Sequence, residues 1–239
     1  MPAAQAGGLK AIRWWVERPS MDGDSPWSAG SPYPALSLYA AAMAYVEAAV
    51  VVYLRALYHP AGFFFPLEPI PLGMALTELG REAATILMIA ALALLSRGSR
   101  REQFAAFVYV FGVWDIFYYA WLKVLIGWPK GLLDPDVLFL IPAPWVGPVL
   151  APMLVSSLLI ALAWVLRPPW PRRSAPAAGR VEWALLLGGA ALVLWTFIRP
   201  NLRLLSPQMT VVYPERYAWE VFSAGWLMGA GAIMRLVFK

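Results

Sequence analysis

Long apolar runs alternate with short polar segments along most of the chain. A helix needs about 20 predominantly apolar residues to cross a bilayer, and six runs meet or approach that length. The six runs are Ala35–Tyr58, Ala75–Ser96, Phe104–Gly127, Trp145–Leu166, Glu182–Ile198 and Tyr217–Phe238. This pattern predicts an all-α, polytopic integral membrane protein with six transmembrane helices.

Prolines interrupt the pattern around the start of the fourth run. They are Pro142, Pro144, Pro148 and Pro152. Proline removes a backbone donor and disfavours helix in the residue before it. We therefore predict that Val137–Ala143 is either non-helical or a separate short helix. We interpret Leu138–Ala143 as a re-entrant or interfacial segment, with the fourth helix starting near Pro144 or Pro148.

The residues before the first run differ from the rest in composition. We interpret residues 1–34 as an N-terminal arm and residues 35–239 as the six-helix transmembrane domain. Within the arm, Leu9–Arg18 is short and basic and contains the pair Trp14 and Trp15. Such a stretch is typical of a helix that lies at the level of the lipid headgroups. An arm that packs on a neighbouring protein is the alternative.

The distribution of lysine and arginine predicts the orientation. With six spans, twelve of these residues lie on the side of the N-terminus and six on the other side. Cytoplasmic loops carry the excess of basic residues, so both termini are expected in the cytoplasm, with the chain in the inner (cytoplasmic) membrane. The aromatic loop His59–Pro71 and the acidic turn Asp134–Asp136 are then expected to face the exterior.

Composition agrees with a membrane protein and excludes several classes of site. Of 239 residues, 61% are hydrophobic and 14% are charged, whereas soluble chains are near 45–50% apolar and 25% charged. The absence of cysteine excludes disulfides, thiolate metal sites and iron–sulfur ligation. A single histidine, His59, excludes multi-histidine metal centres and bis-histidine haem within this chain. We expect no cofactor, no metal and no nucleic-acid partner.

Several ionisable residues fall inside the first three predicted spans. A charge at the centre of a span costs about 2.5–3.5 kcal/mol on insertion scales, and such residues usually mark partners or function. On all three spans these residues lie in the middle and outer half of the membrane. This shared depth predicts a polar cavity in the outer half of the first three helices. The candidate ligand-binding residues are Glu47, Arg55, Glu78, Arg81, Glu82, Asp115, Tyr119 and Lys123.

Two interpretations of this cluster remain open. In the first, it is a network of internal salt bridges that pairs Glu47 with Arg55, Glu78 with Arg81 and Asp115 with Lys123. In the second, it binds an ion, a proton or a polar headgroup. In both, we expect Glu47, Glu82 and Asp115 to converge on one internal cavity, because a short acidic side chain deep in a span cannot reach water.

Three functions are compatible with these features. The first is a non-redox integral subunit of a larger membrane complex, with other membrane subunits as partners. The second is a small ion or proton-coupled transporter that uses the cavity. The third is a membrane enzyme that acts on a lipid-like substrate through carboxylate acid–base chemistry. The sequence ranks the subunit first, and a non-enzymatic role ahead of an enzymatic one.

Overall fold

The computed structural model describes residues 32–96, 99–167, 178–202 and 210–238. The chain divides into two units, Met1–Pro34 and Ala35–Lys239, and the second is described here. The predicted interfacial stretch Leu9–Arg18 lies outside the described residues.

The described part of the chain is mostly helical, and each of the six predicted apolar runs overlaps one helix. The elements are α2 (Tyr33–Tyr58), α3 (Leu72–Leu95), α4 (Arg100–Ile126), β1 (Pro135–Phe139), β2 (Trp145–Pro148), α5 (Leu150–Leu166), α6 (Arg180–Ile198), the 3₁₀ turn η1 (Arg199–Asn201) and α7 (Trp219–Val237).

Four helices in the described part of the chain are long and apolar enough to cross a membrane. They are α2, α4, α6 together with η1, and α7, and they support a membrane-embedded protein. Helix α5 is apolar but has only 17 residues. Helix α3 has 24 residues but carries Glu78, Arg81 and Glu82 in its first half.

Local sequence sets the ends of α4. Ser99 is the N-cap, and its hydroxyl accepts a hydrogen bond from the Glu102 amide while the Glu102 carboxylate accepts one from the Ser99 amide. This reciprocal pair satisfies two amides that a helix start leaves unpaired. The helix ends at Gly127, whose φ of +68° is left-handed and favours glycine.

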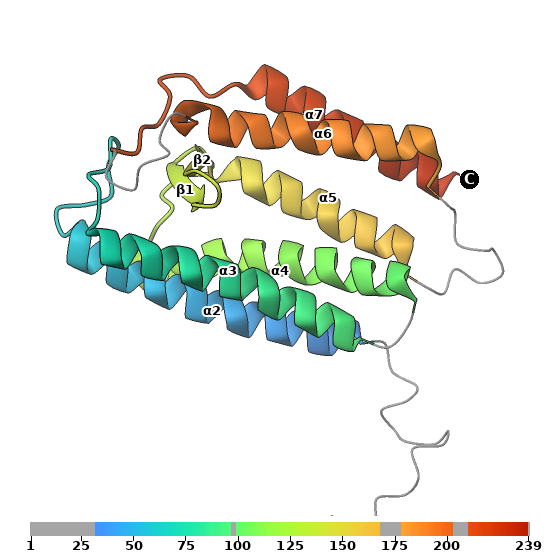
Figure 1. Ribbon diagram of the computed structural model, residues 1–239, viewed down its shortest axis with the longest axis horizontal. Coiled ribbons are helices and arrows are strands. Elements are labelled where there is room, and N and C mark those ends of the chain that lie inside the picture. Colours follow the sequence, from blue (N-terminus) through green and yellow to red (C-terminus); the bar gives the residue numbers. More distant parts are fainter. Residues whose placement is uncertain (1–31, 97–98, 168–177, 203–209, 239) are drawn as a thin grey trace, which may run out of the picture. The chain divides into compact units, whose positions relative to one another are not determined.

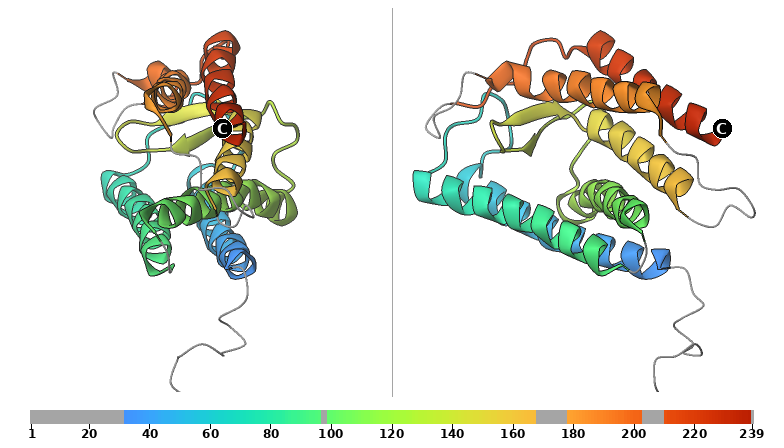
Figure 2. Two further views of the ribbon diagram at one scale, coloured as in Figure 1. Left: turned by 90° about the vertical axis from the view of Figure 1, so that its right-hand side faces the viewer. Right: turned by 45° about the vertical axis from the view of Figure 1, so that its right-hand side comes forward.

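The helices of the second unit form layers. Helices α2, α3 and α4 lie together, α6 and α7 lie side by side, and α5 lies between these two groups (Figures 1 and 2). The antiparallel hairpin of β1 and β2 lies near the start of α5 (Figure 1).

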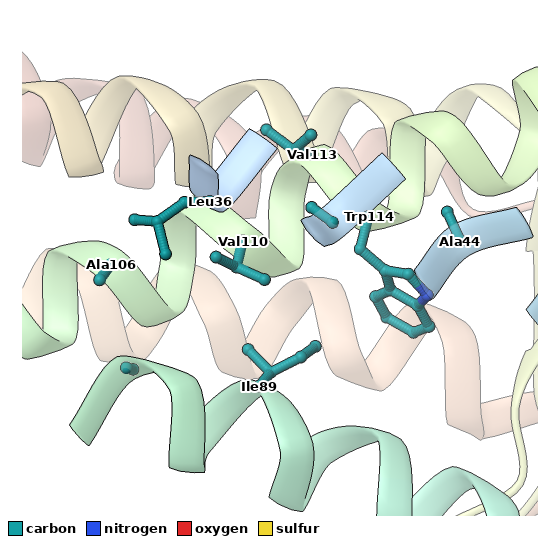
Figure 3. Close-up of a cluster of buried hydrophobic side chains, with 9 residues drawn as sticks. Leu36, Ala44, Ile89, Ala106, Val110, Val113 and Trp114 are labelled. Atoms are coloured by element: carbon teal, nitrogen blue, oxygen red, sulfur yellow. The ribbon is translucent and has the colours of Figure 1, made fainter. Parts of the chain in front are cut away.

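A core of small and branched side chains joins the first three helices. Figure 3 shows Leu36 and Ala44 of α2, Ile89 of α3 and Val110 of α4 in this cluster. Two hydrogen bonds add to the packing between α2 and α4. The Trp121 indole donates to the Ala41 carbonyl at 2.9 Å, and the Ser37 and Tyr109 hydroxyls are 2.7 Å apart.

Helices α6 and α7 approach closely at glycine. A Cβ placed on Gly189 would lie 2.5 Å from the Gly225 carbonyl oxygen, so neither position has room for a side chain. Such small-residue contacts are typical of helix pairs in membranes. The buried Glu182 of α6 pairs with Arg235 of α7, with Nε 3.1 Å from Oε1.

The segment before α5 is non-helical, as predicted, and it is a β-hairpin. Pro135 pairs with Pro148 and Val137 with Val146, and helix α5 begins only at Leu150. The two prolines sit at the ends of their strands, where the missing amide breaks no ladder bond. The sequence pattern did not predict these strands.

Candidate functional site

A cavity of about 320 Å³ lies among α2, α3, α4 and the hairpin, and we call it the polar cavity. Loop residues 67–70 and Val211 also line it. Leu67 and Val211 exchange two backbone hydrogen bonds of 2.9 and 3.0 Å. This part of the cavity lining is therefore formed by segments that are far apart in sequence.

Arg81 of α3 lines the polar cavity and is the centre of an ion-pair network. Its guanidinium pairs with Glu47 of α2 and with Glu78 one turn earlier on α3. Nε lies 2.9 Å from both carboxylate oxygens of Glu78. The hydroxyl of Thr85 also donates to Glu47, at 3.3 Å. One cation is thus shared by two carboxylates.

Two carboxylates on the helices that line the cavity, those of Glu82 and Asp115, have no cation in contact within the described part of the chain. Glu82 is 6% exposed and accepts a hydrogen bond of 2.9 Å from the Leu140 amide of the hairpin. Asp115 of α4 accepts one of 2.7 Å from the Ser156 hydroxyl of α5. Both donors are neutral, so neither carboxylate is neutralised by its protein partner.

Arg55, at the end of α2, closes another side of the cavity. Its Nη2 is 3.0 Å from Oδ1 of Asp136 on β1; the Asp136 side chain is buried, and the Arg55 side chain is 11% exposed. The guanidinium also lies 4.1 Å from the centre of the Phe63 ring and 3.9 Å from that of Trp128, which stabilises the cation through the ring faces.

Burial and the charge of Arg55 shift the pKa values of two titratable groups outside the predicted spans. Burial raises the pKa of the Asp136 carboxyl to about 7, and the Arg55 guanidinium opposes that rise. Burial lowers the pKa of His59, and the charge of Arg55 lowers it further. His59 also lines the polar cavity.

Seven of the eight residues singled out from the sequence line the polar cavity. They are Glu47, Arg55, Glu78, Arg81, Glu82, Asp115 and Tyr119. Lys123 does not line it, because its ammonium donates to the Pro129 carbonyl at 2.7 Å just beyond the end of α4. Lysine near a helix C-terminus commonly binds such free carbonyls.

Of the three predicted ion pairs, Glu78–Arg81 is confirmed and the other two are wrong. Arg81 pairs with Glu47, Arg55 pairs with Asp136, and Asp115 bonds to Ser156. Asp136 belongs to the acidic turn that was expected to face the exterior, and its side chain is buried, with 1% exposed. The apolar run that begins at Val137, directly after it, was the signal that it is buried.

The described residues contain no group of three or more histidine, aspartate or glutamate side chains arranged to hold a metal ion. Arg81 occupies the space between Glu47 and Glu78.

The comparisons with known proteins supply no relative. No protein-family model, no curated protein and no solved structure matches this chain.

Arg81→Gln is expected to lower the free energy of unfolding by about 3 kcal/mol or more, because it leaves two half-buried carboxylates without their cation. Thermal or denaturant unfolding in detergent measures the change. Arg216→Gln is the control, since Arg216 and Glu220 are 84% and 66% exposed and such pairs contribute less than about 1 kcal/mol. Equal losses in the two variants would contradict a structural role for the Arg81 network.

Proposed function

We propose that this protein is an integral membrane protein that binds a monovalent organic cation in the polar cavity, through Glu82 and Asp115. The observation that carries the proposal is that these two carboxylates line the cavity without a cation, while both arginines of the cavity are already paired.

The charge balance of the cavity supports a positively charged occupant. Its lining includes five carboxylates, on Glu47, Glu68, Glu78, Glu82 and Asp115, against the two guanidinium groups of Arg55 and Arg81. Arg55 is in addition neutralised by Asp136. A buried carboxylate without a partner is costly, so the site gains most from a ligand that brings a positive charge.

The other lining residues favour an ammonium group over an inorganic ion. The rings of Trp114, Tyr118 and Tyr119 line the same cavity, and aromatic rings stabilise substituted ammonium groups within about 6 Å. The volume of about 320 Å³ is at the lower end of small-molecule sites, which are about 300–1,000 Å³. Inorganic cations need several oxygen ligands in a defined geometry.

The proposal includes the topology derived from the sequence. Helices α3 and α5 join the four apolar helices as spans, which gives six, with both termini in the cytoplasm of a cell whose inner membrane holds the protein. The positions of the three charged residues support counting α3 as a span. Glu78, Arg81 and Glu82 all line the polar cavity, so the remaining surface of α3 is largely apolar.

Single cysteines test the topology directly, because the chain has none of its own. We expect Gly131→Cys to react with a membrane-impermeant thiol reagent added to whole cells, and Ser174→Cys to react only after the cells are opened. Gly131 is exposed in the turn before β1, and Ser174 lies outside the described residues. The reverse labelling pattern would refute the orientation.

Tetramethylammonium is the probe for cation binding. We expect isothermal titration in neutral detergent to show saturable binding that weakens at least tenfold in Glu82→Gln and in Asp115→Asn, because each variant removes a negative charge from the cavity. The neutral analogue neopentyl alcohol is expected to bind at least tenfold more weakly than tetramethylammonium.

Glu220→Gln is the matched control, since Glu220 is exposed at the start of α7 and outside the cavity. Unfolding curves of all variants establish that each is folded. Equal affinity for the charged and the neutral probe, or equal binding by all folded variants, would overturn the proposal and leave the cluster as a structural network.

A second proposal is that the protein serves as a non-redox integral subunit of a larger membrane complex. The apolar face of α2 supports it, because Leu38, Val46, Tyr53 and Leu57 are each 64–73% exposed and suit contact with another membrane helix as well as with lipid.

Purification in mild detergent followed by native mass spectrometry tests the second proposal. We expect another membrane protein in fixed stoichiometry, and Val46→Lys to release it because the lysine places a charge on that face. Ala191→Lys on the exposed side of α6 is the control. Isolation of this chain alone under the mildest conditions would contradict a subunit role.

A further inference from the structure

A second cavity, of about 360 Å³, lies among α4, α5, α6, α7 and the hairpin, and we call it the apolar cavity. Its walls are largely aliphatic and aromatic, with contributions from Phe111, Val155, Leu159, Leu162, Val193 and Ile233. The charged and hydroxyl-bearing side chains in this lining are Asp115 and Ser156, which bond to each other at 2.7 Å.

The two cavities adjoin at shared residues. Trp114, Asp115 and Leu138 line both of them. The polar cavity, where Glu82 and Asp115 lack a cation, therefore meets the apolar cavity at Asp115. A ligand that touches this carboxylate can extend in two directions, one acidic and one apolar.

The apolar cavity also reaches the side of the bundle. Ala190 and Leu194 of α6 belong to its lining, and both are exposed, Leu194 to 37%. In a membrane this face of α6 borders the acyl chains, so the opening faces lipid rather than water.

We propose that the ligand is an amphiphile, with an ammonium head in the polar cavity and a single long hydrocarbon chain in the apolar cavity. This inference deepens the proposed function and rests on it for the head group. Asp115 lies at the junction and contacts the charged end of the molecule. The chain passes Leu138 and runs along α5 and α6 toward the opening at Ala190.

A pair of probes separates the two parts of the ligand. Tetramethylammonium carries the head alone, and dodecyltrimethylammonium carries the same head with a twelve-carbon chain. The detergent is dodecyl maltoside, which carries a twelve-carbon chain on a neutral head group and is in excess. A hydrocarbon chain without a charge therefore competes with the probe in every measurement. We expect the dodecyl probe to bind the native protein at least tenfold more tightly than the head alone.

Ala190→Phe tests where the chain lies, because it fills the open side of the apolar cavity without changing the core. In this variant, we expect the ratio of the affinity for dodecyltrimethylammonium to that for tetramethylammonium to be at least fivefold smaller than in the native protein. We expect the affinity for tetramethylammonium to be unchanged. Ala191→Phe is the matched control, one residue further along the same helix, exposed and outside both cavities. Partitioning of the probe into micelles is equal for both variants, so the difference between them isolates the cavity.

A photoreactive diazirine at the end of the dodecyl chain gives a second readout that needs no variant. We expect crosslinks on peptides of α5, α6 and α7 that line the apolar cavity, and we expect excess unlabelled dodecyltrimethylammonium to suppress them.

The outcomes distinguish the two proposals. The inference about the hydrocarbon chain would be overturned if this chain raised the affinity equally in Ala190→Phe and Ala191→Phe. Crosslinks spread over the outer faces of the helices would also overturn it. Absence of tetramethylammonium binding would overturn the proposed function, and with it the assignment of an ammonium head.

Discussion

The guanidinium of Arg81 is the group on which the site depends. It lies inside an apolar bundle, where an unpaired charge is expensive, and it is stabilised by Glu47 from α2 and Glu78 from α3. This shared cation fixes the register of the two helices. Because Glu82 is one turn from Glu78, the same register directs Glu82 toward the hairpin, where the Leu140 amide meets it.

Most of the helical architecture could be predicted from the periodicity of apolar residues. Each run contains one helix, because a single apolar segment in a membrane can satisfy its backbone hydrogen bonds only by forming a helix. The hairpin could not be predicted in the same way. Proline showed that Val137–Ala143 is not part of a long helix. The pairing of Val137 with Val146 is accompanied by packing of β2 on α5 and α6, which no local pattern encodes.

The members of the site were more predictable than their partners. Charged residues inside apolar runs are rare, so Glu47, Glu82 and Asp115 were evident as candidates, and they do line one cavity. Glu78 and Arg81 were paired correctly because three residues on one helix have a fixed separation. Arg55 and Asp136 are 81 positions apart, and such a contact depends on how helices rotate against one another, which the sequence alone leaves undetermined.

The pairing of Leu67 with Val211 joins two parts of the chain that are far apart in sequence. Leu67 lies between α2 and α3, and Val211 lies between η1 and α7. Their two backbone hydrogen bonds, each with a net contribution to stability of about 1 kcal/mol, link the connection after α2 to the connection before α7. Because both residues line the polar cavity, this link between the early and the late helices borders the site itself.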